Sequence, residues 1–136
     1  MTRREIREAV FLLLFQNELG CTDMNETIES CVEAFDMELN NEVKSLTEKI
    51  IPKYDELDVI IGKYSETREV ARISKINKTI LRLAIYEILY CPNVPDVVAV
   101  NEAVELSKKY AEKKDSGFIN GLLGNFLKNK KSENAE

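Results

Sequence analysis

Three arginines near the start of the sequence have the clearest potential for chemistry. Arg3, Arg4 and Arg7 stand at or just before the start of an apolar stripe with helical spacing, where Arg4 and Arg7 share a face and Arg3 adjoins them. Forked guanidinium groups beside the amides of a helix N-terminus suit phosphates and flat bases. The alternative is a helix cap in which the arginines pair with Glu5 and Glu8. The segment is therefore either an anion-binding site or a capped helix start.

A second candidate is an aromatic residue near the start of the last apolar stripe. Phe118 follows Ser116 and Gly117, so its ring and the neighbouring backbone amides could receive an unstacked base. The same spacing fits a core residue one turn into an amphipathic helix. Ser116, Gly117 and Phe118 are therefore candidates for binding a base, with core packing as the alternative for Phe118.

The composition excludes several kinds of catalytic and metal site. The sequence has no histidine, which removes the Ser-His-Asp triad, the Cys-His dyad and histidine metal ligands. Cys21, Cys31 and Cys91 are widely spaced and form no Cys-x-x-Cys pair, so they predict reduced apolar residues rather than a disulfide framework or a zinc site. We expect a protein that is not an enzyme and needs no cofactor or metal.

The charge of the chain is unevenly distributed. The net charge is −5, yet between Glu18 and Asp58 acidic residues outnumber lysines twelve to three. The basic residues gather at the N-terminus, in the middle of the chain and in two late clusters. A local basic face could therefore meet phosphates although the protein is acidic overall.

Length and hydropathy indicate an ordinary globular chain. With 136 residues, 44% hydrophobic and 32% charged, one domain or two small lobes can bury a sufficient core. No apolar run approaches the ~20 residues that a membrane span requires. We therefore expect a cytoplasmic protein that does not contact a membrane.

The elements that must position these residues are helices, because apolar residues recur at intervals of three and four almost everywhere. We predict helices from Ile6 towards a stop at Gly20, from Met24 to Phe35, from Leu39 to Ile61, from Ile76 to Leu89, from Asp96 to about Ala111, and from Phe118 to Leu127. Pro52 should kink or split the third of these. Caps are expected at Asp23 with Glu26, at Ser74, and at Asp115 or Ser116.

These helices predict an all-α protein of six or seven helices. The N-terminal lobe should cover about residues 1–64 and the C-terminal lobe about residues 65–130, with a polar tail over 131–136. A short helical turn within 65–73 would link the lobes.

Three linked motifs in the second half make the sequence similar to the NusB family of bacterial transcription antitermination factors. They are ILRLAIYEIL at 80–89, VP at 94–95 followed by VAVNEAVELSK at 98–108, and SGFINGLL at 116–123. The arginine-rich start leading into Leu14, Phe15 and Gln16 also resembles the family. The chain departs from the family pattern at four positions: Arg68 for Trp, Asn77 for Asp, Ser107 for Ala and Gly124 for Asp.

The resemblance implies two small helical bundles that share one core, and a single RNA-binding domain over residues 1–136. It implies binding to boxA-type single-stranded nascent RNA jointly with NusE, a small-subunit ribosomal protein, in an antitermination complex with RNA polymerase, notably on ribosomal RNA operons. Arg3, Arg4, Arg7, Ser116, Gly117 and Phe118 would then be RNA-binding residues. A homodimer that buries the arginine segment would be autoinhibitory.

Two other functions are compatible with the residues. A non-catalytic helical adaptor without direct RNA binding could use the acidic lobe as a docking face for another protein. A helical DNA-binding regulator is less favoured, since no helix pair carries a clear helix-turn-helix signature. Salt-dependent binding to single-stranded RNA over duplex DNA distinguishes the three.

Overall fold

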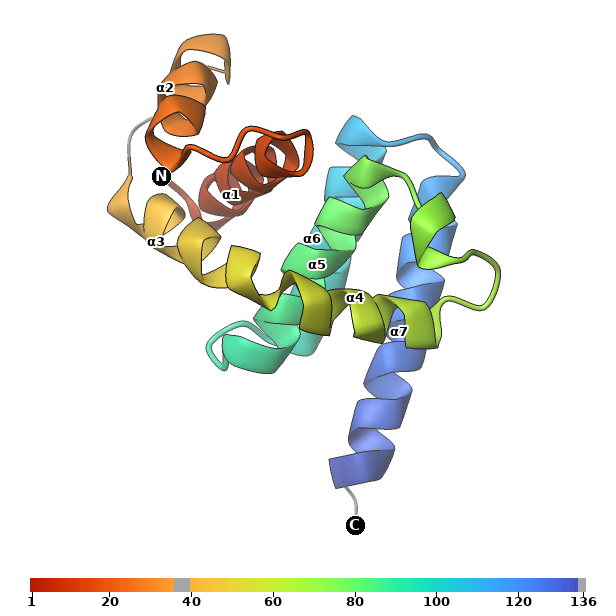
Figure 1. Ribbon diagram of the computed structural model, residues 1–136. Coiled ribbons are helices and arrows are strands. Elements are labelled where there is room, and N and C mark those ends of the chain that lie inside the picture. The colour runs from red at the N-terminus through yellow and green to blue at the C-terminus, as the bar shows by residue number, and fades with distance from the viewer. Residues whose placement is uncertain (36–39, 135–136) are drawn as a thin grey trace. The chain divides into compact units, whose positions relative to one another are not determined.

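The computed structural model describes residues 1–35 and 40–134, and the regular secondary structure of these residues is helical (Figure 1). Seven α-helices and two short 3-10 turns occur in this part of the chain, which confirms the all-α class. None of its helices is long and apolar enough to cross a membrane. The contacts divide the chain into two compact units, Met1–Lys53 and Tyr54–Glu136.

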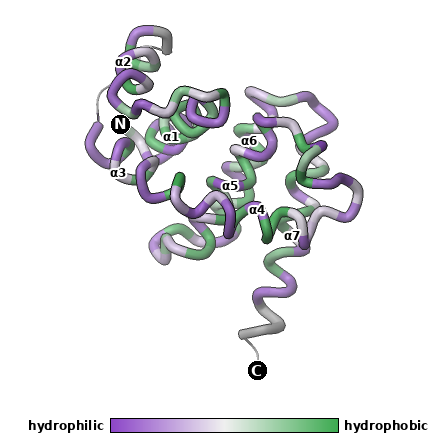
Figure 2. The backbone as a smooth tube through the Cα atoms, viewed as in Figure 1, coloured by the Kyte–Doolittle hydropathy of each residue, from purple (hydrophilic) through white to green (hydrophobic). Residues whose placement is uncertain are grey.

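The first unit is built around α1 (Arg3–Glu18), which packs against both α2 (Met24–Phe35) and α3 (Asn41–Ile50). The wide apolar face of α1 explains its central place, because every residue from Ala9 to Leu14 is buried. Figure 2 shows apolar and hydrophilic residues alternating along the helices, as expected for elements that bury one face.

Both ends of α1 carry strong local signals. At the start, the Thr2 hydroxyl accepts a hydrogen bond from the Glu5 amide at 3.0 Å, and the Glu5 carboxylate accepts one from the Thr2 amide at 3.2 Å. This is a reciprocal capping box. At the end, Gly20 has φ +107°, and the amides of Gly20 and Cys21 donate to the carbonyls of Asn17 and Gln16. This Schellman arrangement favours glycine, since other residues rarely adopt that φ.

The next two helices begin at side-chain caps. The Asp23 carboxylate accepts hydrogen bonds from the amides of Asn25 and Glu26, so Asp23 caps α2 as expected. The Asn40 side chain accepts from two amides at the start of α3. Leu39, where the third helix was expected to begin, lies outside the described residues.

Pro52 interrupts the third predicted helix, as expected. The helix α3 stops at Ile50, the 3-10 turn η1 covers Ile51–Lys53, and α4 covers Tyr54–Tyr64. Proline has no amide hydrogen and its ring clashes with the preceding turn, so the α-helical bonding pattern breaks there. The division between the units falls at this break rather than near residue 64, because α4 packs against α5 and α7 of the second unit.

The second unit consists of α4, the 3-10 turn η2 (Val70–Arg72), α5 (Lys75–Tyr90), α6 (Asp96–Tyr110) and α7 (Asp115–Asn134). Its centre is α5, which contacts α4, α6 and α7 and is buried continuously from Thr79 to Ile88. Ser74 caps α5 through a hydrogen bond from the Asn77 amide. The last helix is longer than expected: it continues through residues 131–134 of the predicted tail, while 135–136 lie outside the described residues.

A buried arginine joins α4 to α5. Arg82 on α5 is 5% exposed and donates to both carboxylate oxygens of Asp58 on α4, at 2.8 and 2.7 Å. Its guanidinium carbon lies 3.9 Å from the centre of the Tyr54 ring. The fork of Arg82 thus fixes both the position and the orientation of α4.

Candidate functional site

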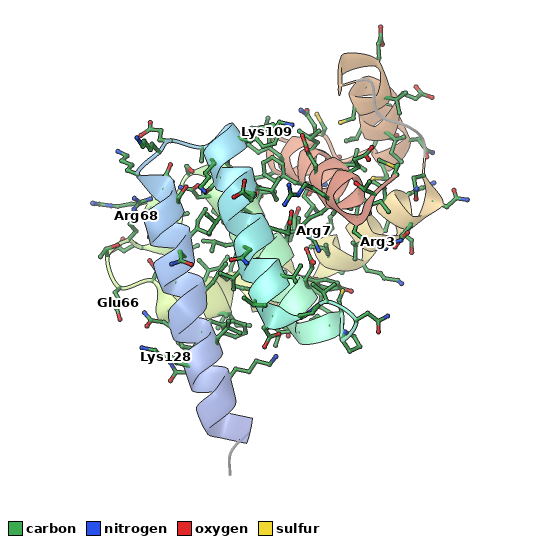
Figure 3. The ribbon with its side chains drawn as sticks, turned by 180° about the vertical axis from the view of Figure 1, so that it is seen from behind. Arg3, Arg7, Glu66, Arg68, Lys109 and Lys128 are labelled. Atoms are coloured by element: carbon green, nitrogen blue, oxygen red, sulfur yellow. The ribbon has the colours of Figure 1, made fainter. Side chains whose placement is uncertain are left out.

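The three arginines lie on the first two turns of α1, where Arg3 and Arg4 are exposed and Arg7 is half-buried. Figure 3 labels Arg3 and Arg7 on this helix. Arg3 is held by a residue far away in the sequence: its guanidinium donates to both carboxylate oxygens of Glu42 on α3, with Nη2 and Oε2 3.1 Å apart. This hydrogen bond lowers the pKa of Glu42 and raises that of Arg3. The Arg3 side chain nevertheless remains 74% exposed and accessible to a ligand.

The helix cap beside the arginines is made by other groups. Thr2 and Glu5 form the capping box, and the hydrogen bond from the Thr2 backbone amide lowers the pKa of the Glu5 carboxyl. The amide of Glu5 is therefore engaged by the Thr2 hydroxyl and is not offered to a ligand. What the first turn presents to solvent is the guanidinium of Arg3 and the exposed side chain of Arg4.

Ser116, Gly117 and Phe118 come together on the first turn of α7, in the second unit. They have different surroundings. The Ser116 hydroxyl lies 2.7 Å from the hydroxyl of Ser107 on α6, which is fully buried. Ser116 thus joins α6 to α7, whereas Gly117 is exposed and Phe118 is half-buried.

The Phe118 ring is covered by an arginine. The guanidinium carbon of Arg68 lies 4.1 Å from the ring centre, and Arg68 Nη1 is 3.3 Å from Asp115 Oδ1. Asp115, expected as a cap, is the first residue of α7; its other carboxylate oxygen accepts from the Glu112 amide at 3.1 Å. Buried Asp115 thereby fixes Arg68 over Phe118, and a guanidinium stacked on a ring is a favourable arrangement.

A surface hollow of about 360 Å³ opens beside Phe118. Helix α7 contributes Gly117, Phe118, Gly121, Leu122 and Asn125 to its lining, and the end of α4 with the segment after it contributes Tyr64, Ser65, Glu66 and Thr67. Figure 3 shows Glu66 and Arg68 on the same side of α7. The volume lies within the range of about 300–1,000 Å³ that small-molecule sites occupy.

Sequence reasoning did not assign Glu42, Glu66 or Asn125 to a site, and it noted Arg68 only as a departure from the family pattern. Residues 65–73 are charged and weakly periodic, so no pattern indicated that this segment packs beside the first turns of α7. The pairing of Arg3 with Glu42 joins residues 39 positions apart, which local spacing does not reveal. The four residues could be found only after the helices had been placed.

The arrangement favours binding over catalysis. Among the described residues, no group of three His, Cys, Asp or Glu side chains is placed to hold a metal ion. The start of α1 presents cationic arginine side chains, and the start of α7 presents the aromatic ring of Phe118 with the acidic residue Glu66 beside it. Cations and open aromatic surfaces suit phosphates and unstacked bases.

Comparison with known sequences gives consistent matches over nearly the whole chain. The model of the NusB family matches residues 4–128. Transcription antitermination protein NusB of Acetivibrio thermocellus is 37% identical over 130 residues, which cover 94% of this chain and 90% of that protein. The protein of the same name from Clostridium acetobutylicum is 39% identical, covering 93% of this chain and 96% of its own length.

Solved structures match the fold. NusB of T. maritima superposes with a TM-score of 0.78 at 29% identity, covering 94% of this chain and 92% of that chain. A chain of a crystal structure of antitermination factors NusB and NusE in complex with dsRNA gives a TM-score of 0.76 at 25% identity, covering 93% of this chain and 96% of that chain.

Proposed function

Since the chain belongs to the NusB family, whose members are non-catalytic antitermination factors, we propose that it is an RNA-binding transcription antitermination factor. In this proposal it binds boxA-type nascent RNA jointly with NusE and helps RNA polymerase to read through terminators, notably on ribosomal RNA operons. The match to NusB proteins over nearly the whole chain carries the proposal, and the similarity to one chain of a structure of NusB and NusE in complex with dsRNA supports it. Nascent RNA implies action in the cytoplasm.

The arginine segment is the proposed phosphate-binding surface. Arg3, Arg4 and Arg7 follow one another on the first two turns of α1, and the guanidinium of Arg3 is highly exposed. The ion pair with Glu42 is solvent-exposed at both partners, so it contributes little stability and a phosphate can replace the carboxylate. Arginine binds phosphate oxygens with two parallel hydrogen bonds, which also orients the RNA backbone.

The start of α7 is the proposed base-binding surface. Phe118 is half-buried and lines an open hollow, and the Arg68 guanidinium stacks on its ring. Bases of single-stranded RNA stack on aromatic rings and on arginine planes. Gly117 lines the same hollow, whereas Ser116 contributes by fixing the first turn of α7 against α6.

The experiment is a titration of a fluorescently labelled boxA-type RNA with the full chain, in the presence and absence of the cognate NusE. We expect weak, salt-dependent binding alone and tighter binding with NusE, because the partner widens the surface that contacts phosphates. Duplex DNA of the same sequence serves as the control and should bind more weakly.

Each other outcome would change the assignment. Identical RNA affinity with and without NusE would contradict joint binding. Binding to NusE without binding to any RNA would favour the adaptor function instead. Stronger binding to the duplex DNA would support a DNA-binding regulator and would overturn the proposal.

A further inference from the structure

The hollow beside Phe118 contains a group that phosphate binding does not explain. Glu66 is an exposed acidic residue that lines the hollow. A carboxylate repels phosphate and accepts hydrogen bonds, so it disfavours the RNA backbone and favours a group that presents N–H donors. The chemistry of this hollow therefore differs from that of the arginine segment.

The carboxylate of Glu66 is held in place from the opposite wall. Asn125 on α7 donates a hydrogen bond from Nδ2 to Glu66 Oε1 at 3.1 Å. An ionised carboxylate offers about four lone-pair positions over its two oxygens, so this bond leaves acceptor capacity for a ligand. A fixed acceptor loses less conformational entropy on binding than a freely rotating one.

The α7 wall of the hollow is open because two of its residues are glycines. Gly117 and Gly121 are four residues apart and so share a face of the helix. A Cβ atom added at either position would meet no other atom within 4 Å, so neither glycine is required by internal packing. Glycine inside a helix costs about 1 kcal/mol relative to alanine, and here it leaves room for a flat group against the backbone.

Aromatic and cationic groups complete the site. Phe118 and Tyr64 provide ring surfaces on the lining, while Arg68 stacks on Phe118 and is tied to Asp115. Because Phe118 lines the hollow, the Arg68 guanidinium stacked on its ring places a positive charge close to the hollow, where it can attract the phosphate of a bound nucleotide. These aromatic, acceptor and cationic groups match a flat aromatic ring that has N–H donors on its edge and is attached to a phosphate.

On the basis of the proposed function, we infer that the hollow binds a guanine base of single-stranded RNA, with the Glu66 carboxylate accepting hydrogen bonds from guanine N1–H and N2–H. Among the four RNA bases, guanine alone presents two adjacent N–H donors on its Watson–Crick edge, the edge by which proteins distinguish unstacked bases. Adenine, cytosine and uracil each present a single donor group there. Glu66 is thus a specificity-determining residue.

The test compares two variants that remove the same charge from neighbouring positions. Glu66→Gln keeps an oxygen that can accept a hydrogen bond from Asn125, but its NH2 group is a donor and cannot accept hydrogen bonds from the N–H groups of guanine. Glu69→Gln is the control, because Glu69 is exposed, lies in the same segment and does not line the hollow. Affinities are measured by fluorescence anisotropy for uridine-rich RNAs that carry a single guanosine, inosine or adenosine. Inosine lacks only the N2 amino group.

We expect the wild-type protein and Glu69→Gln to bind the guanosine RNA about tenfold more tightly than the inosine or adenosine RNA, as for a base read by paired hydrogen bonds. In Glu66→Gln this ratio should fall to near one. For the adenosine RNA, which does not make the paired hydrogen bonds to Glu66, both variants should gain a similar amount of affinity, since each loses one negative charge. Equal melting temperatures of the two variants would show that the fold is unchanged.

An undiminished guanosine preference in Glu66→Gln would overturn the inference, as would wild-type protein that binds the three RNAs equally well. Either result leaves the proposed function intact, because RNA is still bound. Failure of the wild-type protein to bind any RNA, even with NusE present, would overturn the proposed function and this inference together.

Discussion

At the scale of single residues, one arginine of the proposed phosphate-binding surface already has a counter-charge. Glu42 holds the Arg3 guanidinium, yet both side chains are about half exposed or more, so solvent screens the pair and it contributes little to stability. The pKa of Glu42 is lowered by this hydrogen bond, so the carboxylate is fully charged at neutral pH. If Arg3 binds RNA as proposed, an RNA phosphate must compete with Glu42 for its guanidinium.

The first prediction concerns this competition. Glu42→Gln should raise RNA affinity a few-fold, because the neutral amide holds Arg3 less strongly and no longer repels the RNA backbone. The measurement is an anisotropy titration at fixed salt. Glu48→Gln is the control, since it removes one charge from an exposed position of the same helix. An equal gain in both variants would mean that net charge alone is responsible, and that Arg3 does not exchange partners.

The second prediction concerns Phe118, for which core packing and base stacking remain distinguishable. The ring is half-buried and stacked under Arg68, so Phe118→Ala should lower the free energy of unfolding by about 1–2 kcal/mol rather than the ~3–5 kcal/mol typical of a core phenylalanine. RNA affinity should fall by about 1–3 kcal/mol with little change in its salt dependence.

Phe118→Leu provides the matched comparison, because it retains most of the apolar contact but removes the ring. We expect near wild-type stability with an affinity loss similar to that of the alanine variant. Normal RNA affinity in a stable Phe118→Leu protein would remove Phe118 from the binding site.

At the scale of elements, most of the helical architecture follows from local signals in the sequence. Asp23, Ser74 and the apolar spacing indicate where helices begin and which face they bury, and Pro52 indicates a break. The affiliation of α4 with the second unit could not be predicted from spacing. It depends on the pairing of Arg82 with Asp58 and on packing against α7, both of which join residues distant in sequence.

The candidate site likewise combines residues that the sequence indicates with residues that only the structure brings to the site. The sequence indicates the arginines of α1 because three of them cluster at the start of an apolar stripe, and it indicates Phe118 because that residue follows Ser116 and Gly117 near the start of another stripe. Arg68 and Glu66 are charged residues in an irregular segment. Only the structure shows that Arg68 contacts Phe118 and that Glu66 is hydrogen-bonded to Asn125 on α7.

The third prediction tests the connection between α4 and α5. Asp58→Ala removes two charge-assisted hydrogen bonds from buried Arg82, so we expect a loss of about 3 kcal/mol in the free energy of unfolding. Chemical denaturation monitored by circular dichroism measures it. Asp55→Ala, at an exposed position in the first turn of the same helix, should cost less than about 1 kcal/mol. Comparable losses in the two variants would mean that the Arg82 pair adds nothing beyond helix-end electrostatics.

At the scale of the whole molecule, the charge distribution opposes indiscriminate binding. The chain carries a net charge of −5 and would repel nucleic acid at long range, whereas the start of α1 places three arginines on its first two turns. Repulsion from the acidic remainder favours dissociation of RNA that engages the arginines alone. An additional base contact or a partner such as NusE would then be needed for tight binding.

The last prediction follows from this balance and concerns the salt dependence of RNA binding. If Arg3, Arg4 and Arg7 each contact a phosphate, replacing any one with alanine should weaken all RNAs similarly, because phosphate contacts carry no sequence information. It should also reduce the slope of log affinity against log salt by about 0.7, the value for one phosphate of a single strand. Titrations over a range of salt concentrations measure the slope. Lys75→Ala, which removes an exposed positive charge at the start of α5, should leave it nearly unchanged. An arginine variant that loses affinity while keeping the wild-type slope would show that its side chain acts through the fold or through a base, and not through the backbone.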